Sequence, residues 1–324
     1  MYTTSPDRQI VEIALDEWRG ADASGRATLA RALDGAVRDP GVFLLRPTAD
    51  MVPTIAEAVA ATRAFFALPL AAKQACLDPV DQFVGYRGLG ANRNTYGGAD
   101  LKEMYHIGPR HAPTLGAPEP VDAETAMRRS SLWPDLPEFV VAWHRYYTVM
   151  QELAGDLREL FALALGIDAD ALTEYWTDNS ADLAANFYPT GDPSYVGQVR
   201  NAVHCDETFF TVLHQDGTAG GLSIEWGDGT WTPVALDGTA FLVNIGRLFE
   251  LVTAGAWRAV PHQVEPVDAA DGEPRLTIPF FFRPRPGVRL QRLPGYGEPD
   301  PSPPTLAEWL AAERLAVAAP INAS

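Results

Sequence analysis

The stretch NAVHCDETFFTVLHQDG, residues 201–217, contains two histidines, and each is followed two places later by an aspartate. The two pairs are His204 with Asp206 and His214 with Asp216. Residues two apart in a β-strand point to the same face of the sheet, so either pair could offer an imidazole and a carboxylate to one metal ion. Two ligands make a poor metal site, and a third ligand is therefore expected from a neighbouring strand.

The residues that follow each pair distinguish the two possibilities. Asp216 precedes a glycine, and Asp-Gly is a strong turn signal, so the second pair has an ordinary explanation as a strand end. Asp206 has no such explanation, because the residues after it are not a preferred tight turn. H-x-(D/E) alone is a weak signal, since about one is expected by chance in this composition. The residues favour His204 and Asp206 as ligands, and His262 on a later predicted strand is the candidate third ligand.

The character of the chain changes near Ala184. From there, short apolar or β-branched segments alternate with Asp-Gly and Gly-Gly turns, which is typical of an antiparallel sandwich or jelly roll. Before it, an apolar stripe that recurs every three to four residues predicts a long helix over about 138–165. A capping-box pattern predicts another helix over 305–317. We therefore expect one α+β domain over 1–324, made of a mixed α/β amino-terminal part (1–183), a β core (184–290) and the carboxy-terminal helix.

Composition narrows the class of protein. The chain has 324 residues, 47% of them hydrophobic and 21% charged, and a net charge of −17. This acidity argues against nucleic-acid binding, because phosphate backbones attract Lys/Arg-rich surfaces. Two cysteines give no disulfide framework, and the sequence shows neither a signal peptide nor an uncharged run of membrane-spanning length. These features predict a soluble, cytoplasmic protein without a nucleic-acid or membrane partner, and they leave a small anionic substrate possible.

Several segments resemble, in order, the iron(II)- and 2-oxoglutarate-dependent dioxygenases of the isopenicillin N synthase-like branch. HCDETFFTVLHQD (204–216) is similar to that family's H-x-D-x-x-x-(L/F)-T-x-L-x-Q-D segment, and RLTIPFFFRP (275–284) to its R-x-S strand, with threonine in place of serine. NFYP (186–189) resembles N-x-Y-P, and the stretch from Asn244 to His262 resembles the one that ends in the family's distal histidine. Further matches in the first third of the chain are FFALPLAAK, VGYRGLG and DLKEMYHIG.

The resemblance implies a fold, a reaction and a set of site residues. The fold would be a double-stranded β-helix (jelly-roll, cupin-like) core wrapped by helices. The reaction would be oxidation of a small organic molecule by hydroxylation, desaturation or cyclisation, with dioxygen consumed and 2-oxoglutarate converted to succinate and CO2. The implied iron(II) ligands are His204, Asp206 and His262. The implied 2-oxoglutarate contacts are Arg275, Thr277, Tyr188 and Asn186. Candidate substrate contacts are Tyr86, Arg87, Tyr105, Phe210 and Phe282.

These residue types suit that chemistry. Two imidazoles and one carboxylate on one face of an octahedral iron(II) leave three adjacent positions open for 2-oxoglutarate and dioxygen. The far carboxylate of 2-oxoglutarate would lie among apolar strands and needs a fixed cationic partner. Arg275 can offer a bidentate fork, and Thr277 lies two residues further along the same strand face.

Three alternatives remain open at this point. A zinc hydrolase could use the same three ligands with a water, although the arginine strand would then lack a purpose. An oxidase of the isopenicillin N synthase type uses no 2-oxoglutarate, and its Arg-x-Ser pair holds the substrate carboxylate. A non-catalytic binding module could keep the pocket without turnover.

The sequence departs from the family pattern at Arg247, where aspartate is usual, and at Gln263, where arginine is usual.

The other candidate ligands have simpler explanations. Cys205 lies between two predicted ligands and should therefore point to the opposite face, as a small core residue. His106, His111 and His144 are expected on loops or helix surfaces, with His106 near the pocket in the resembling family.

Overall fold

The computed structural model describes residues 8–78, 84–91, 98–109, 132–266 and 273–318. Its α-helices are α1 (Leu15–Gly20), α2 (Ala23–Arg38), α3 (Val52–Phe66), α4 (Leu70–Gln74), α6 (Pro137–Leu165), α7 (Thr173–Trp176), α8 (Arg247–Val252) and α9 (Leu306–Ala318). Short 3-10 helices are η1 (Ala169–Leu172) and η2 (Pro193–Tyr195). Its strands are β1 (Glu12–Ala14), β2 (Val42–Arg46), β3 (Gly85–Arg87), β4 (Glu103–Ile107), β5 (Asp182–Tyr188), β6 (Asn201–His204), β7 (Phe210–Asp216), β8 (Leu222–Glu225), β9 (Trp231–Pro233), β10 (Phe241–Ile245), β11 (His262–Val264) and β12 (Arg275–Phe282).

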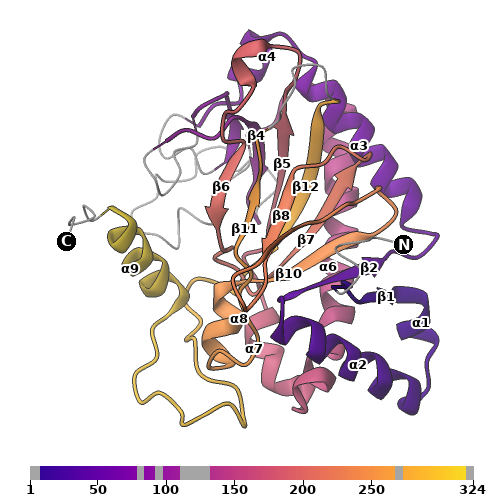
Figure 1. Ribbon diagram of the computed structural model, residues 1–324, viewed down its shortest axis with the longest axis vertical. Coiled ribbons are helices and arrows are strands. Elements are labelled where there is room, and N and C mark those ends of the chain that lie inside the picture. Colours follow the sequence, from indigo (N-terminus) through magenta and orange to yellow (C-terminus); the bar gives the residue numbers. More distant parts are fainter. Residues whose placement is uncertain (1–7, 79–83, 92–97, 110–131, 267–272, 319–324) are drawn as a thin grey trace.

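The strands form two sheets (Figure 1). The larger has the order β1-β2-β10-β7-β12-β5-β4-β3, and the smaller has the order β6-β11-β8-β9. Strands β1 and β2 pair in parallel, whereas β12 pairs antiparallel with both β5 and β7. Side chains from β5, β7, β10 and β12 of the larger sheet and from β6, β8 and β11 of the smaller line one common cavity. The two sheets therefore face each other as in a jelly roll, and the predicted α+β fold class is confirmed.

Helices α2 and α3 each pack against α6, and α6 also contacts β12 of the larger sheet (Figure 1). The predicted long helix is confirmed as α6, with Pro137 in its first turn and Gly166 after its last residue. Gly166 has a φ of 68°, the left-handed conformation that commonly ends helices. The predicted apolar stripe is buried, and Trp143 and Tyr146 on it are fully inaccessible. It is a core face, as predicted.

The carboxy-terminal helix begins with the predicted capping box. The backbone N–H of Thr305 donates to Glu308 Oε2 at 2.8 Å, and the Glu308 N–H donates to Thr305 Oγ1 at 3.2 Å. These bonds satisfy two amides that a helix start would otherwise leave without partners. Strand β1 is only three residues long, because helix α1 begins at Leu15 directly after it. That residues 1–324 form a single domain stays a prediction.

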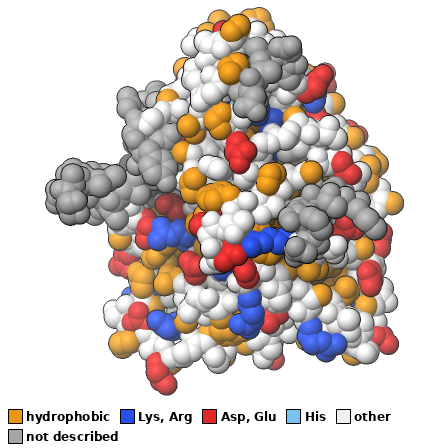
Figure 2. Space-filling view, in the orientation of Figure 1, with side chains coloured by type: hydrophobic (Ala, Val, Ile, Leu, Met, Phe, Trp, Pro, Cys, Tyr) orange, Lys and Arg blue, Asp and Glu red, His pale blue; other side chains and the backbone are white. Residues whose placement is uncertain are grey.

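Two surface properties bear on the partners of the protein. Among the described residues, no helix has both the length and the apolar composition needed to cross a bilayer. On the face shown in Figure 2, acidic and basic side chains of the described residues are interspersed rather than gathered into one broad basic area.

Candidate metal and co-substrate site

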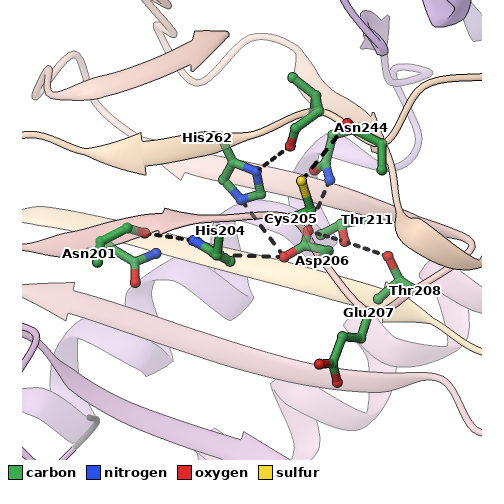
Figure 3. Close-up of polar contacts among 12 residues, drawn as sticks. Asn201, His204, Cys205, Asp206, Glu207, Thr208, Thr211, Asn244 and His262 are labelled. Carbon is green, nitrogen blue, oxygen red and sulfur yellow. Dashed lines mark hydrogen bonds and ion pairs between the residues drawn. The ribbon is translucent and has the colours of Figure 1, made fainter. Parts of the chain in front are cut away.

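Three ligand-type side chains meet at one edge of the smaller sheet. His204 ends β6, Asp206 follows two residues later, and His262 opens β11 directly opposite His204 in the antiparallel register. The Nε2 atoms of His204 and His262 lie 3.6 Å and 3.7 Å from Asp206 Oδ1 (Figure 3). One ligand atom from each residue lies within 4.8 Å of the other two. The structure therefore brings the three predicted ligands together, at a separation that one metal ion could bridge.

The histidine tautomers are fixed by backbone carbonyls. Nδ1 of His204 lies 2.8 Å from the Ala202 carbonyl oxygen, and Nδ1 of His262 lies 3.1 Å from that of Val260. A carbonyl can only accept a hydrogen bond, so each Nδ1 carries the proton and each Nε2 keeps its lone pair. Both lone pairs are thereby available at the atoms nearest to Asp206, which is the usual arrangement of metal-binding histidines.

The pKa values of His204 and Asp206 also favour a role as metal ligands. Burial, followed by the charge of His262, lowers the pKa of His204 to about 4, despite the opposing effect of Asp206. His204 is therefore neutral near pH 7 and able to donate its lone pair. Burial alone would raise the pKa of Asp206, but the two histidines and two hydrogen bonds outweigh it and lower that pKa to about 2. His204 and Asp206 are thus both in the protonation state that binds a metal ion.

The hydrogen bonds to Asp206 also fix its orientation. Thr211 Oγ1 donates to Asp206 Oδ2 at 2.6 Å, and Asn244 Nδ2 donates to the same oxygen at 2.9 Å (Figure 3). The other oxygen, Oδ1, is left facing the histidines. The loop that carries Asp206 is held by helix α8, since the Arg247 N–H donates to the Asp206 carbonyl at 2.9 Å. A Cβ on Gly246 would lie 2.3 Å from the Thr208 carbonyl oxygen, so this close approach requires glycine.

The predicted co-substrate residues line the same cavity as the three ligands, on the larger sheet. Arg275 on β12 is 1% exposed, and its Nε donates to Gln215 Oε1 at 3.0 Å. Its guanidinium carbon lies 5.1 Å from the centroid of the Tyr188 ring. Burial lowers the pKa of Arg275, and no carboxylate among the described residues forms an ion pair with it. The result is a buried cation in need of an anion.

Two neighbouring polar atoms also lack partners. Thr277 Oγ1 and Asn186 Oδ1 are buried, and neither has a hydrogen-bond partner among the described residues. The two residues are direct neighbours across β12 and β5. A buried polar group without a partner typically costs about 1–3 kcal/mol. An unpaired guanidinium and a free hydroxyl in one cavity are what a bound carboxylate-bearing ligand would satisfy, because both can donate to its oxygens.

Four of the five predicted substrate contacts belong to the packed core and do not line this cavity. The Tyr86 hydroxyl donates to Glu103 at 2.5 Å, and the Tyr105 hydroxyl donates to the Leu132 carbonyl at 2.8 Å. Phe210 and Phe282 stack on each other with ring centroids 4.8 Å apart. Each of these rings is enclosed by other protein side chains, and contact of these four residues with substrate stays a prediction.

The alternation of side chains along a strand explains which residues line the cavity and which do not. Arg87 is partly exposed on β3, opposite Met104, and is not a cavity residue either. Phe281, and not Phe282, lines the cavity, because it shares a strand face with Arg275. The same two-residue periodicity in the sequence could have identified it. Further cavity residues for which the sequence predicted no role are Lys102, Met104, Asn201, Thr211, Leu213, Asn244 and Pro279.

The remaining candidate ligands have other environments. His214 is 5% exposed and packs against Phe241, and burial lowers its pKa to about 4. Cys205 Sγ lies 3.8 Å from the Ala259 carbonyl, and burial raises the pKa of its thiol to about 11. His106 is buried in β4 beside Asp182, so its predicted place on a loop or helix surface is wrong. His144 lies on helix α6, as predicted, and His111 is outside the described residues.

Comparison with family models gives two matches. Residues 179–284 match the 2OG-Fe(II) oxygenase superfamily, and residues 11–136 match the amino-terminal family described as non-haem dioxygenase in morphine synthesis. The first match contains all three clustered ligands and both β5 and β12. The second covers most of the part that precedes the long helix.

Characterised relatives align over most of the chain. Validamycin A dioxygenase of Streptomyces hygroscopicus subsp. limoneus is 32% identical over 292 residues, which are 86% of this chain and 78% of that protein. Gibberellin 20 oxidase 2 of Oryza sativa subsp. indica is 28% identical over 279 residues, 86% of this chain and 68% of that protein.

Solved structures show the same fold. A full-length Neurospora crassa protein in complex with alpha-KG superposes with a TM-score of 0.80 at 21% identity, covering 95% of this chain and 96% of that one. The dioxygenase for auxin oxidation of rice superposes with a TM-score of 0.68 at 24% identity, covering 95% and 96%.

Proposed function

Because the chain belongs to the iron(II)- and 2-oxoglutarate-dependent oxygenases, we propose that His204, Asp206 and His262 hold its iron. We further propose that the cavity beside them admits 2-oxoglutarate and a small organic substrate. One observation carries the proposal. A buried set of metal-ligand atoms and a buried arginine without an anion share a single cavity between the two sheets.

The donor set suits iron(II). Two imidazoles with free Nε2 lone pairs and one carboxylate form the facial triad that is characteristic of non-haem iron(II) oxygenases. His204 and His262 belong to the smaller sheet, and Asp206 lies in the loop after β6. The side of the ion away from these ligands would therefore face the larger sheet. Ligands that bind there would lie between the metal and the Arg275 strand.

The larger sheet suits 2-oxoglutarate. Arg275 would form a fork with the C5 carboxylate, Thr277 would donate its hydroxyl to the same group, and Tyr188 would pack beside it. Asn186, two residues before Tyr188 on the same strand face, would contact the end of the ligand nearer the metal. With iron(II), 2-oxoglutarate and dioxygen bound, the site would supply the oxidation of an unactivated C–H bond, with succinate and CO2 as co-products.

The apolar part of the cavity would receive the substrate. Met104, Pro279 and Phe281 line it on the larger sheet, and they would exclude water from the reacting bond. The relatives are named for the small molecules validamycin A and gibberellin, which supports a small organic substrate here. Hydroxylation, desaturation and cyclisation all begin with the same C–H oxidation and are kept as the possible outcomes. The predicted cytoplasmic location stays a prediction.

The test is a titration of 2-oxoglutarate into protein loaded with iron(II) under nitrogen, followed by the metal-to-ligand charge-transfer band. We expect saturable binding and, after dioxygen is admitted, slow formation of succinate even without the primary substrate. Protein that metal analysis shows to hold iron, but that neither binds nor consumes 2-oxoglutarate, would contradict the proposal. That outcome would favour the oxidase chemistry that needs no 2-oxoglutarate.

A further inference from the structure

A second arginine is buried close to the proposed co-substrate site. Arg200 immediately precedes β6 and is 2% exposed. Its Nε and Nη2 atoms are buried without a hydrogen-bond partner among the described residues, and no described carboxylate forms an ion pair with it. Arginine is almost never fully buried unless it is paired. In the protein without ligands, the Arg200 guanidinium therefore lacks, among the described residues, an anion and hydrogen-bond partners for two of its nitrogen atoms.

The aromatic ring of Tyr188 lies close to the Arg200 guanidinium. The Arg200 guanidinium carbon lies 5.0 Å from the ring centroid, and that of Arg275 lies 5.1 Å from the same centroid. Both distances are within the range of cation–π attraction. Tyr188 is itself 1% exposed, and its buried ring is near a guanidinium group from each of two different segments. Arg275 belongs to the larger sheet, whereas Arg200 leads into the smaller one.

The two guanidinium groups also affect each other. Burial, followed by the positive charge of Arg275, lowers the pKa of Arg200 to about 10. Arg200 is still charged at neutral pH, so two like charges act on one buried ring. Like charges in a poorly solvated region repel, and an anion placed near both would relieve that repulsion. The C5 carboxylate of 2-oxoglutarate is the anion that the proposed function brings to this end of the cavity.

We propose that Arg200 is a positioning residue for the co-substrate, an inference that rests on the function proposed above. Arg200 holds the Tyr188 ring in place together with Arg275 and adds a second positive charge at the carboxylate end of the cavity. It does not line the cavity, so it acts through Tyr188 and through its charge rather than by direct contact. Recognition of the far carboxylate then depends on two arginines, of which one touches the ligand.

The test separates the far carboxylate from the rest of the ligand. 2-Oxoglutarate and 2-oxopentanoate share the metal-binding end, but 2-oxopentanoate lacks the C5 carboxylate. Each is titrated under nitrogen into the iron(II)-loaded protein and its variants, and the charge-transfer band gives the Kd. Arg200→Met removes the charge and keeps much of the length, Arg200→Lys keeps the charge without the planar group, and Arg289→Met controls for loss of an arginine outside the cavity. Arg289 is exposed, and its Nη1 donates to the Pro303 carbonyl at 2.9 Å.

We expect Arg200→Met to weaken 2-oxoglutarate binding roughly tenfold, which corresponds to about 1.4 kcal/mol. Binding of 2-oxopentanoate should change less than about twofold, because it has no carboxylate for the second charge to attract. Arg200→Lys should recover part of the loss, since a lysine keeps the charge but cannot stack in the same way. Arg289→Met should leave both constants unchanged.

Other outcomes overturn the inference in distinguishable ways. Equal weakening of both ligands by Arg200→Met would show that Arg200 only supports the fold, and no change in either would show that it is not coupled to the ligand. If Arg200→Met does not fold, Arg200→Lys must still lower the preference for 2-oxoglutarate over 2-oxopentanoate, or the inference is wrong. If the wild-type protein itself shows no such preference, the proposed role of Arg275 fails as well. A wild-type preference that survives Arg200→Met contradicts only the inference.

Discussion

The two ends of the cavity differ in how completely the protein satisfies its own polar atoms. At the metal end, Asp206 Oδ2 and both Nδ1 atoms of the histidines have hydrogen-bond partners in the protein, which leaves Oδ1 and the two Nε2 atoms for a metal. At the co-substrate end, Thr277 Oγ1 and Asn186 Oδ1 have no partner among the described residues, and Arg275 has no anion.

At the metal end, hydrogen bonds already orient the side chains in the free protein. At the co-substrate end, polar atoms have no partner among the described residues until a ligand binds. Removing a group from the metal end should break existing hydrogen bonds or remove a ligand, so stability and metal binding should fall together. Removing a group from the co-substrate end should weaken ligand binding without lowering the stability of the free protein. The predictions below test this contrast, from the largest expected effect to the smallest.

The largest effect should come from His204, with His214 as its matched control on the same stretch. His204→Ala removes a ligand lone pair, so protein reconstituted anaerobically should retain almost no iron. His214→Ala should retain its iron but lose about 2 kcal/mol or more of unfolding free energy, because it empties a packed site beside Phe241. Iron analysis and urea unfolding measure the two quantities. Iron lost from His214→Ala and kept by His204→Ala would show that the register of the ligands is wrong.

Arg275→Leu should have the next largest effect. It leaves the C5 carboxylate of 2-oxoglutarate without a partner, and breaking one side of a buried pair typically costs about 3–5 kcal/mol. The Kd of 2-oxoglutarate should then rise roughly a hundredfold to a few thousandfold, while iron affinity stays the same. Arg275→Lys should recover only part of the loss, because an ammonium cannot reproduce the fork. A change below about threefold in the anaerobic titration of Arg275→Leu would contradict the assignment and direct attention to Arg283 and Arg285.

Thr211→Val should have an intermediate effect, on the metal rather than on the co-substrate. It removes the 2.6 Å hydrogen bond to Asp206, and loss of such an outer partner typically lowers metal affinity about 10–100-fold. The same bond helps to lower the pKa of Asp206, so that pKa should rise in the variant. As the pH falls, His204 with its pKa of about 4 is protonated before Asp206, so the effect of the variant is expected as weaker iron binding at neutral pH.

The measurement for Thr211→Val is iron affinity at neutral and at acidic pH. Thr177→Val is the control, because its hydroxyl donates to the Thr173 carbonyl on α7, far from the ligand set. An unchanged iron affinity at neutral pH in Thr211→Val would mean that the hydrogen bond to Asp206 does not affect the metal end.

The sequence predicts the parts of this site that depend on short-range geometry. The spacing of His204 and Asp206 places both at the end of one strand, and Arg275 and Thr277 lie on one face of another, because alternation along a strand is local. The long helix and the capped carboxy-terminal helix were predictable for the same reason. The strand and turn pattern left a sandwich and a jelly roll as alternatives, and the residues left His262 as a candidate third ligand. The resemblance implied the jelly roll and the complete set of three ligands.

Contacts between distant segments were not predictable in this way. Lys102 and Arg200 lie just before β4 and β6, and their places depend on tertiary bonds such as that from the Leu101 N–H to the Val199 carbonyl. The neighbours of two predicted substrate contacts line the cavity. Met104 and Phe281 line it, whereas Tyr105 and Phe282 face the core. A one-residue shift on a strand exchanges the two faces, so a motif match without a face assignment does not identify the residues of the wall.

Thr277→Val is expected to have the smallest effect and gives the sharpest test of the contrast, because stability and binding should change in opposite directions. In the free protein the Thr277 hydroxyl is buried without a partner among the described residues, so replacing it with a methyl group should raise the unfolding free energy by up to about 1 kcal/mol. Thr211→Val, which breaks an existing bond, should lower it instead. With 2-oxoglutarate bound, the Thr277 hydroxyl would gain a charged acceptor, and its loss should weaken binding by about fivefold, or roughly 1 kcal/mol. Urea unfolding of the metal-free protein and the anaerobic titration together measure both signs. If Thr277→Val destabilises the free protein as much as Thr211→Val does, the hydroxyl already has a partner, and the co-substrate end is as complete as the metal end.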